Sequence, residues 1–162
     1  FGVFAKADIS KGACVTLYPC HACRLKARWR GSDGEKVAQM MIHGVDKKPT
    51  PWHGRLDTFE EKYSEYGYDV DACFQIYGNK NIRDSNAFLG HMINDVCKPV
   101  HHEKRSLKSD KTYMQLCKIG MNCYPEHLGD LEKVVVAIVA SREIKAGEEL
   151  LMPYGLPYWY QD

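Results

Sequence analysis

The most informative stretch of the chain is Val134-Val-Val-Ala-Ile-Val-Ala-Ser-Arg-Glu-Ile-Lys-Ala-Gly-Glu-Glu-Leu-Leu-Met-Pro-Tyr-Gly-Leu-Pro-Tyr-Trp159. Its first seven residues are apolar and mostly β-branched, which predicts a buried strand. The tripeptide Lys145-Ala-Gly147 predicts a turn whose glycine takes a positive φ. A tyrosine then stands between Pro153 and Gly155, so its backbone is restricted before the ring and free to turn sharply after it.

This ordered pattern resembles the C-terminal core of the SET domain family, whose members transfer methyl groups from S-adenosylmethionine to lysine side chains. The matching elements are Ala140–Ile144, Gly147–Leu150, Tyr154-Gly155 and Tyr158-Trp159. Further matches, to the family's opening turn and strands, are Phe1–Ala5, Ile9–Gly12 and Val15–Tyr18. The chain enters that opening motif at its second glycine, Gly2, without a methionine before it. We therefore expect the sequence to be a fragment of a longer protein.

A third match in the middle of the chain departs from the family at several positions. The segment Gly90-His-Met-Ile-Asn-Asp-Val-Cys-Lys-Pro99 resembles the family motif Arg-Phe-Ile-Asn-His-Ser-Cys-x-Pro-Asn. Asn94, Cys97 and Pro99 are kept, whereas Asp95 replaces the family histidine. The other replacements are His91, Val96 and Val100. We expect the pair Asn122-Cys123 to restore the last asparagine after an insertion.

The resemblance implies a β-rich fold with a minor α component. Small curved β-sheets would surround a knot-like C-terminal crossing, with a short helical insert. We expect a single SET domain over residues 1–162. Its parts would be N-terminal strands at about 1–25, a variable insert at about 26–84, and a catalytic half at about 85–162 with an insertion at 98–121.

Local patterns predict the secondary structure of the insert. Apolar residues at helical spacing predict a helix within Gly34–Gly44, and a capping box with an aromatic stripe predicts another over Asp57–Gly67. A strand is predicted at Ala72–Tyr77 and a turn at Gly78–Asn81. Ser85 or Asn86 is predicted to cap a helical turn that runs to Met92.

The bulk composition is that of an average globular domain. The chain has 162 residues, of which 44% are hydrophobic and 27% are charged. No apolar run reaches the roughly 18–20 residues of a membrane helix, so we expect no membrane partner. The net charge of +1 argues against the whole domain being an electrostatic nucleic-acid binder. Seven cysteines without framework spacing favour reduced thiols in the nucleus or cytoplasm.

Two charged clusters and one cysteine pair leave alternatives open. The six carboxylates of Asp57–Asp71 form either a solvated helix face or a wall beside a basic peptide. The basic loop Lys98–Lys111 is either solvated or in contact with nucleic acid or acidic protein. Cys20 and Cys23 have zinc-knuckle spacing, but the sequence has no second pair of ligands to complete a zinc site. Strand geometry would also point the two side chains to opposite faces. We expect no metal there or at Cys97.

The resemblance also implies roles for individual residues. Tyr154 would be catalytic, its hydroxyl lying where the methyl group passes from sulfur to nitrogen. The residues implied to bind S-adenosylmethionine are Gly2, Phe4, Asn94, Asp95, Tyr154 and Trp159. The residues implied to contact the substrate are Tyr18, Met152 and Tyr158. Tyr18 is equally interpreted as a buried sheet tyrosine. The Asp95 carboxylate either imitates the main-chain role of the family histidine or repels and reorders contacts near the adenosine.

We therefore expect a protein lysine methyltransferase whose substrate is a histone tail, acting on chromatin in the nucleus, with the cytoplasm as the alternative location. A non-histone protein substrate is the second possibility. The third is a SET-like binding module with reduced catalysis, which the altered Asn94-Asp95-Val96 motif favours and the intact Tyr154 opposes.

Overall fold

The structure is a computed structural model of residues 1–162. It describes residues 2–25, 39–43, 49–51, 66–70, 74–79, 81, 87–97, 106–129 and 135–160. The chain divides into two compact units: Phe1–Leu17 together with Met92–Asp162, and Tyr18–His91. The first unit is discontinuous in sequence because its N-terminal strand pairs with a strand near the C-terminus.

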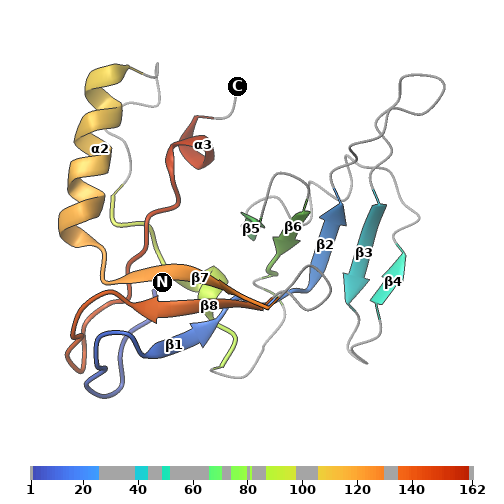
Figure 1. The fold of residues 1–162 in the computed structure, drawn as a ribbon, viewed down its shortest axis with the longest axis horizontal. Coiled ribbons are helices and arrows are strands. Elements are labelled where there is room, and N and C mark those ends of the chain that lie inside the picture. The colour runs from blue at the N-terminus through green and yellow to red at the C-terminus, as the bar shows by residue number, and fades with distance from the viewer. Residues whose placement is uncertain are drawn as a thin grey trace. The chain divides into compact units, whose positions relative to one another are not determined.

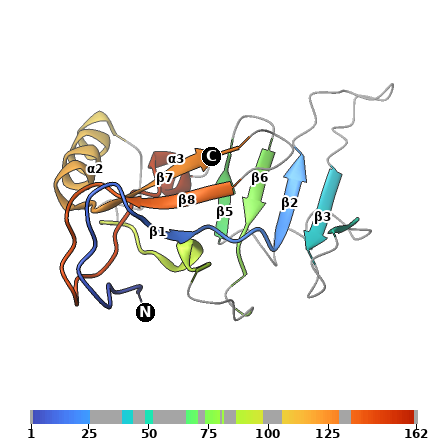
Figure 2. The same cartoon turned by 60° about the horizontal axis from the view of Figure 1, so that its bottom comes forward.

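A three-stranded antiparallel sheet forms the centre of the first unit (Figures 1 and 2). Its order is β1 (Cys14–Leu17), β8 (Val135–Ala140), β7 (Cys123–Leu128). Residues 136–140 of the central strand are all buried, because a strand paired on both edges and covered on its faces is best filled by apolar residues. The buried strand predicted from the sequence is confirmed.

Segments far apart in sequence lie side by side around this sheet. The C-terminal stretch after β8 pairs with the N-terminal segment through the isolated bridges Phe4↔Glu149 and Ile9↔Ile144. On its other side it pairs in parallel with the middle segment through Asn94↔Leu151. The turn between these pairings has Gly147 at φ +87°, as the sequence predicted. Three sequence motifs therefore meet along one short stretch of backbone.

Helix α2 (Leu107–Gly120) occupies much of the expected 98–121 insertion, for which the sequence pattern predicted no helix. Ser106 caps it: the Ser106 hydroxyl accepts from the Ser109 amide, and the Ser109 hydroxyl accepts from the Ser106 amide. Only Tyr113 and Cys117, one turn apart, are buried. A buried face of two residues produces almost no helical periodicity in the sequence. The capping box also has serine instead of glutamate or glutamine at its third helical position, so it is hard to recognise.

The second unit is a five-stranded antiparallel sheet. In sheet order its strands are β4 (Pro49–Pro51), β3 (Gln39–His43), β2 (Ala22–Leu25), β6 (Phe74–Tyr77) and β5 (Gly67–Asp69). Ala22, Ile76 and Tyr77 form its buried centre. The strand predicted at 72–77 is confirmed within its described part, 74–77.

The helix predicted within residues 34–44 is wrong over its described part, because residues 39–43 form strand β3. Met40 and Met41 pair with Arg24 and Cys23 of β2, so tertiary pairing with a neighbouring strand overrides the helical spacing of the apolar residues. The helix predicted to start at Asp57 lies outside the described residues, apart from its end, where β5 begins at Gly67.

The remaining helical elements are short. Of the helical turn predicted to run from Ser85 or Asn86 to Met92, only the end is helical in the described residues, as the 3₁₀ helix η2 (Gly90–Met92). Near the C-terminus α3 (Leu156–Trp159) follows Gly155, whose φ is +89°. In the part of the chain that the structure describes, no helix is both long and apolar enough to span a bilayer.

Candidate functional site

Asp95 is the centre of a hydrogen-bond network in the first unit. Its Oδ2 accepts from the Tyr113 hydroxyl at 2.7 Å, from Trp159 Nε1 at 2.7 Å, and from the Tyr154 amide at 3.2 Å. The Tyr113 hydroxyl in turn accepts from the amide of Gly155 at 3.0 Å. A carboxylate oxygen suits this position, because it accepts several hydrogen bonds and has no proton of its own to place.

The network also fixes the protonation of Tyr113. The ring of Tyr113 is buried, and burial, together with its hydrogen bond to Asp95, raises the pKa of its hydroxyl far above the usual range. The hydroxyl therefore keeps its proton and remains a donor to Asp95. The structure adds a third interpretation of Asp95 to the two that the sequence allowed: its carboxylate organises the C-terminal segment.

Tyr154 is held at both its backbone and its hydroxyl. Its hydroxyl donates to the carbonyl oxygen of Ile93 at 2.8 Å, while its amide donates to Asp95. Tyr158 meets its ring edge to face at 4.6 Å between centroids, and Trp159 stacks beside it at 6.2 Å with 13° between the planes. The structure therefore brings together three of the predicted site residues in one aromatic cluster.

A second cluster joins Gly2, Asn94 and Glu149. Asn94 Nδ2 donates to Glu149 Oε1 at 2.7 Å. A Cβ on Gly2 would overlap that same carboxylate oxygen and lie 3.0 Å from Asn94 Nδ2. Because glycine has no side chain, position 2 leaves room for the Asn94 amide and the Glu149 carboxylate beside the main chain. Phe4, paired through its backbone with Glu149, is 56% exposed, so its ring is open to a ligand.

Asn122 holds the segment Glu149–Leu151 from the other side. It is buried, its Nδ2 donates to the carbonyl of Glu149 at 2.8 Å, and its Oδ1 accepts from the amide of Leu151 at 2.8 Å. The expectation that Asn122 stands in for the last asparagine of the family motif stays a prediction. Met152, the residue after Leu151, is buried, and its amide donates to the carbonyl of Asn94 at 3.1 Å.

Tyr18 belongs to the second unit and has its contacts there. It is 8% exposed, its hydroxyl donates to the carbonyl of Tyr66 at 2.8 Å, and its ring packs against Tyr68 with centroids 5.4 Å apart. The buried His91, which replaces the family arginine, meets Tyr18, Tyr66 and His21 edge to face. Tyr18 is therefore buried, but it lies between β1 and β2 and belongs to neither strand; its contact with the substrate stays a prediction.

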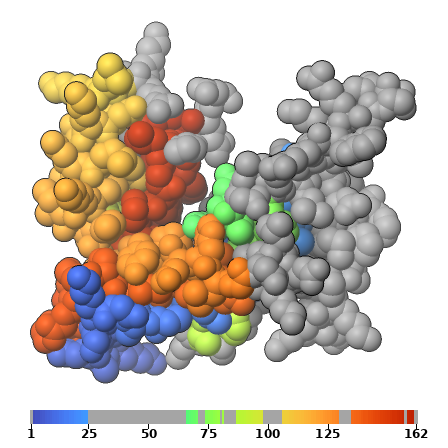
Figure 3. All heavy atoms as spheres, viewed as in Figure 1, coloured from blue at the N-terminus to red at the C-terminus, as the bar shows by residue number. Residues whose placement is uncertain are grey.

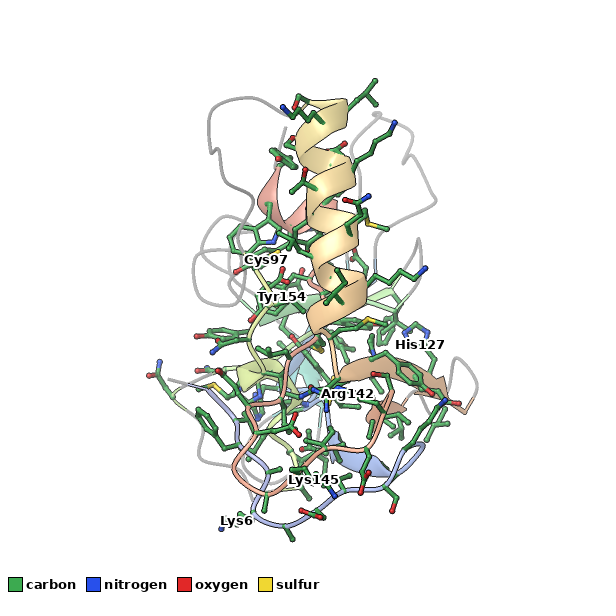
Figure 4. The ribbon with its side chains drawn as sticks, turned by 90° about the vertical axis from the view of Figure 1, so that its left-hand side faces the viewer. Lys6, Cys97, His127, Arg142, Lys145 and Tyr154 are labelled. Atoms are coloured by element: carbon green, nitrogen blue, oxygen red, sulfur yellow. The ribbon has the colours of Figure 1, made fainter. Side chains whose placement is uncertain are left out.

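The thiols near the site are protonated. Burial and the nearby Asp95 charge raise the pKa of Cys97, and burial raises the pKa of Cys117 to about 11. The thiols of Cys97 and Cys117 hydrogen bond with each other, and Figure 4 shows Cys97 and Tyr154 labelled beside α2. Among the described residues no three His, Cys, Asp or Glu side chains lie close enough to form a metal site.

The pair Cys20 and Cys23 departs from the strand-based expectation. Cys20 precedes β2, so the two thiols meet and share a hydrogen bond instead of pointing to opposite faces. That hydrogen bond, followed by burial, raises the pKa of Cys20 well above its usual range.

Two residues of the site were missed by the sequence analysis. Tyr113 lies in the unpredicted helix α2, so its contact with Asp95 had no local signal. Glu149 was quoted only as part of the Gly147–Leu150 turn, whereas its carboxylate reaches Gly2 and Asn94. The acidic side chains Glu60, Glu61 and Glu65 lie outside the described residues, as do residues 98–105 of the basic loop.

Two comparisons with known proteins gave a match. A family model described as the SET domain matches residues 1–155. Among solved structures, the crystal structure of CpSET8 from Cryptosporidium superposes with a TM-score of 0.50 at 18% sequence identity. That match covers 95% of this chain and 52% of the other, so the chain spans about half the length of that protein. A search of curated proteins gave no match.

Proposed function

The chain belongs to the SET domain family, and from this premise we propose that it is an S-adenosylmethionine-dependent protein lysine methyltransferase. The observation that carries the proposal is the fixation of Tyr154. Three consecutive residues surround it: Ile93 accepts from its hydroxyl, Asp95 accepts from its amide, and Asn94 between them holds Glu149. A tyrosine restrained at both ends, in an aromatic cluster, is suited to aim its hydroxyl during a group transfer.

The cluster of Gly2, Asn94 and Glu149 fits the proposed cofactor. S-adenosylmethionine supplies the methyl group on its positively charged sulfonium. Its amino-acid end carries an ammonium and a carboxylate, and the Glu149 carboxylate with the Asn94 amide forms a polar site of the matching kind. Gly2 keeps the main chain open there, and the exposed ring of Phe4 offers an apolar face.

The aromatic cluster suits a lysine side chain. Its alkyl stem would pack against the faces and edges of Tyr158 and Trp159, which lie 5.0 Å apart between centroids. Tyr154 would orient the uncharged amine for in-line attack and exclude water from it. The buried Met152, next to Pro153, would limit the space at the amine. The proposed methyl transfer requires no metal and no protein nucleophile.

The proposed substrate is a histone tail, with a non-histone protein as the alternative, and the proposed location is the nucleus. The support comes from composition: the acidic run Asp57–Asp71 would attract a lysine- and arginine-rich peptide, chiefly by speeding association. A SET-like binding module is less well supported, because the Asp95 substitution that favoured it is accounted for by the hydrogen-bond network.

The test is direct. Calorimetry of the chain 1–162 with S-adenosylmethionine measures cofactor binding, and labelled methyl transfer onto core histones measures the reaction. Binding with transfer to histone lysines supports the proposal, and transfer only to other proteins selects the alternative substrate. Binding without transfer to any protein would favour the binding module, and no binding would overturn the proposed cofactor.

Replacing Asn94 with alanine is expected to weaken S-adenosylmethionine binding about tenfold, because the amide that holds Glu149 is lost. The domain should also lose stability, since the Asn94 side chain satisfies a partly buried carboxylate. Calorimetry and thermal unfolding measure the two effects.

Asn122→Ala is the matched control for that prediction. It removes a buried asparagine that bonds to the backbone of Glu149 and Leu151, so it should lower the Tm while the folded fraction binds the cofactor normally. Equal cofactor affinities for Asn94→Ala and the unchanged protein would remove Asn94 from the proposed cofactor site.

A further inference from the structure

Helix α2 reaches the turn after Tyr154 through the side chain of Tyr113. The Tyr113 hydroxyl donates to Asp95 Oδ2 and accepts from the amide of Gly155, at 2.7 and 3.0 Å. Tyr113 is 1% exposed, the most buried side chain of the helix. In Figure 3 the helix, in yellow to orange, lies against the C-terminal segment, in red. The hydroxyl thus joins an inserted helix to the turn that follows Tyr154.

Two successive main-chain amides are held by this arrangement. The Tyr154 amide donates to Asp95 and the Gly155 amide donates to Tyr113. The peptide planes on both sides of the Tyr154 Cα are therefore restrained, and the direction of its Cα–Cβ bond with them. Trp159, which stacks beside Tyr154, is held by the same Asp95 oxygen through its indole nitrogen.

The hydrogen bond from Tyr113 depends on having an aspartate, not the family histidine, at position 95. Three donors converge on one Asp95 oxygen. A neutral imidazole has one acceptor nitrogen and must place a proton on the other, so a histidine there could not accept all three. The carboxylate and the tyrosine hydroxyl of the inserted helix therefore work as a pair.

We propose that Tyr113 is a positioning residue for methyl transfer: through Asp95 and Gly155 it sets the orientation of Tyr154 and Trp159, so that docking of α2 is required for full activity. This proposal rests on the proposed methyltransferase function. Tyr113 itself touches neither substrate nor cofactor in it. Removing its hydroxyl loosens the turn and misaims the tyrosine without changing the aromatic wall.

The test is the substitution Tyr113→Phe, which keeps the buried ring and deletes only the hydroxyl. We expect kcat to fall about tenfold, because a small misorientation at a reacting group is costly. KM for the lysine peptide and the affinity for S-adenosylmethionine should change by less than about twofold. An unchanged kcat would overturn the proposal, as would an equal fall for the control below.

Tyr160→Phe is the matched control. The Tyr160 hydroxyl contacts the Ser109 hydroxyl at 3.2 Å, so it also links α2 to the C-terminal segment but does not touch Asp95 or Gly155. Tyr160→Phe should leave kcat within about twofold of the unchanged protein. The comparison separates a specific effect of the Tyr113 hydroxyl from a general loosening of α2.

Amide hydrogen exchange provides a readout independent of activity. In the unchanged protein the amides of Tyr154 and Gly155 should be protected, and Tyr113→Phe should speed exchange at Gly155 about tenfold or more, with the Trp159 indole N–H resonance shifted. Absence of protection in the unchanged protein would overturn the proposal even if Tyr113→Phe did not fold. Absence of methyl transfer by the unchanged protein would instead overturn the proposed function and leave the exchange result interpretable.

Discussion

Tyr154→Phe is expected to lower kcat for lysine methylation by about 100-fold, the largest effect on activity of any single substitution proposed for this chain. The substitution removes only the hydroxyl, which donates to the carbonyl of Ile93 at 2.8 Å. The amide of Tyr154 remains bound to Asp95, and its ring still stacks beside Trp159. The fold and the affinity for S-adenosylmethionine should therefore stay nearly unchanged.

Single-turnover methyl transfer with saturating cofactor measures this effect, and calorimetry checks cofactor binding in parallel. Tyr158→Phe is the control, because it deletes the hydroxyl from the ring that meets Tyr154 at 4.6 Å but not from Tyr154 itself. We expect a much smaller loss there. If Tyr154→Phe retained full activity, Tyr154 would have no part in the mechanism.

Asp95→Ala is expected to cause the largest loss of stability among these variants. It leaves the Tyr113 hydroxyl, the Trp159 indole nitrogen and the Tyr154 amide without their shared acceptor. Each buried donor that loses its acceptor costs about 1–3 kcal/mol, and Tyr154 and Trp159 are only half-buried, so we expect a total loss of about 3 kcal/mol. For a domain of this size that lowers the Tm by about 6–12 °C.

Thermal unfolding of Asp95→Ala beside Asp95→Asn tests this interpretation. The asparagine keeps one acceptor oxygen but replaces the other with a donor amide, so it should retain part of the stability. A Tm for Asp95→Ala equal to that of the unchanged protein would mean that the network contributes nothing to folding. In that case Asp95 would also lose its proposed role in holding the Tyr154 turn.

The role of Asp95 was the point at which the sequence left the site most uncertain. The motif comparison identified the position as altered, and the alternatives were imitation of a main-chain contact or repulsion near the cofactor. The three donors to Asp95 come from residues 18, 59 and 64 positions away. Partners at such separations leave no periodic or local pattern, so only the folded chain reveals them.

The sequence alone determined the elements that depend on local chemistry. A run of β-branched residues predicted β8, and glycine at a turn position predicted the positive φ of Gly147. The ordered motifs also indicated the family and the candidate Tyr154. These features follow from side-chain shape, backbone freedom and residue order, which are all present in the unfolded chain.

Tertiary structure decided the features that depend on distant partners. Residues 39–43 are a strand because β2 pairs with them, although their apolar spacing is helical. Helix α2 buries only Tyr113 and Cys117, so its amphipathic pattern is weak. Its contacts with the folded domain therefore stabilise it more than its own sequence does. Glu149 acquires its role only when the N-terminal glycine and Asn94 come beside it. Long-range pairing and burial supply these free energies, and neither exists until the chain has folded.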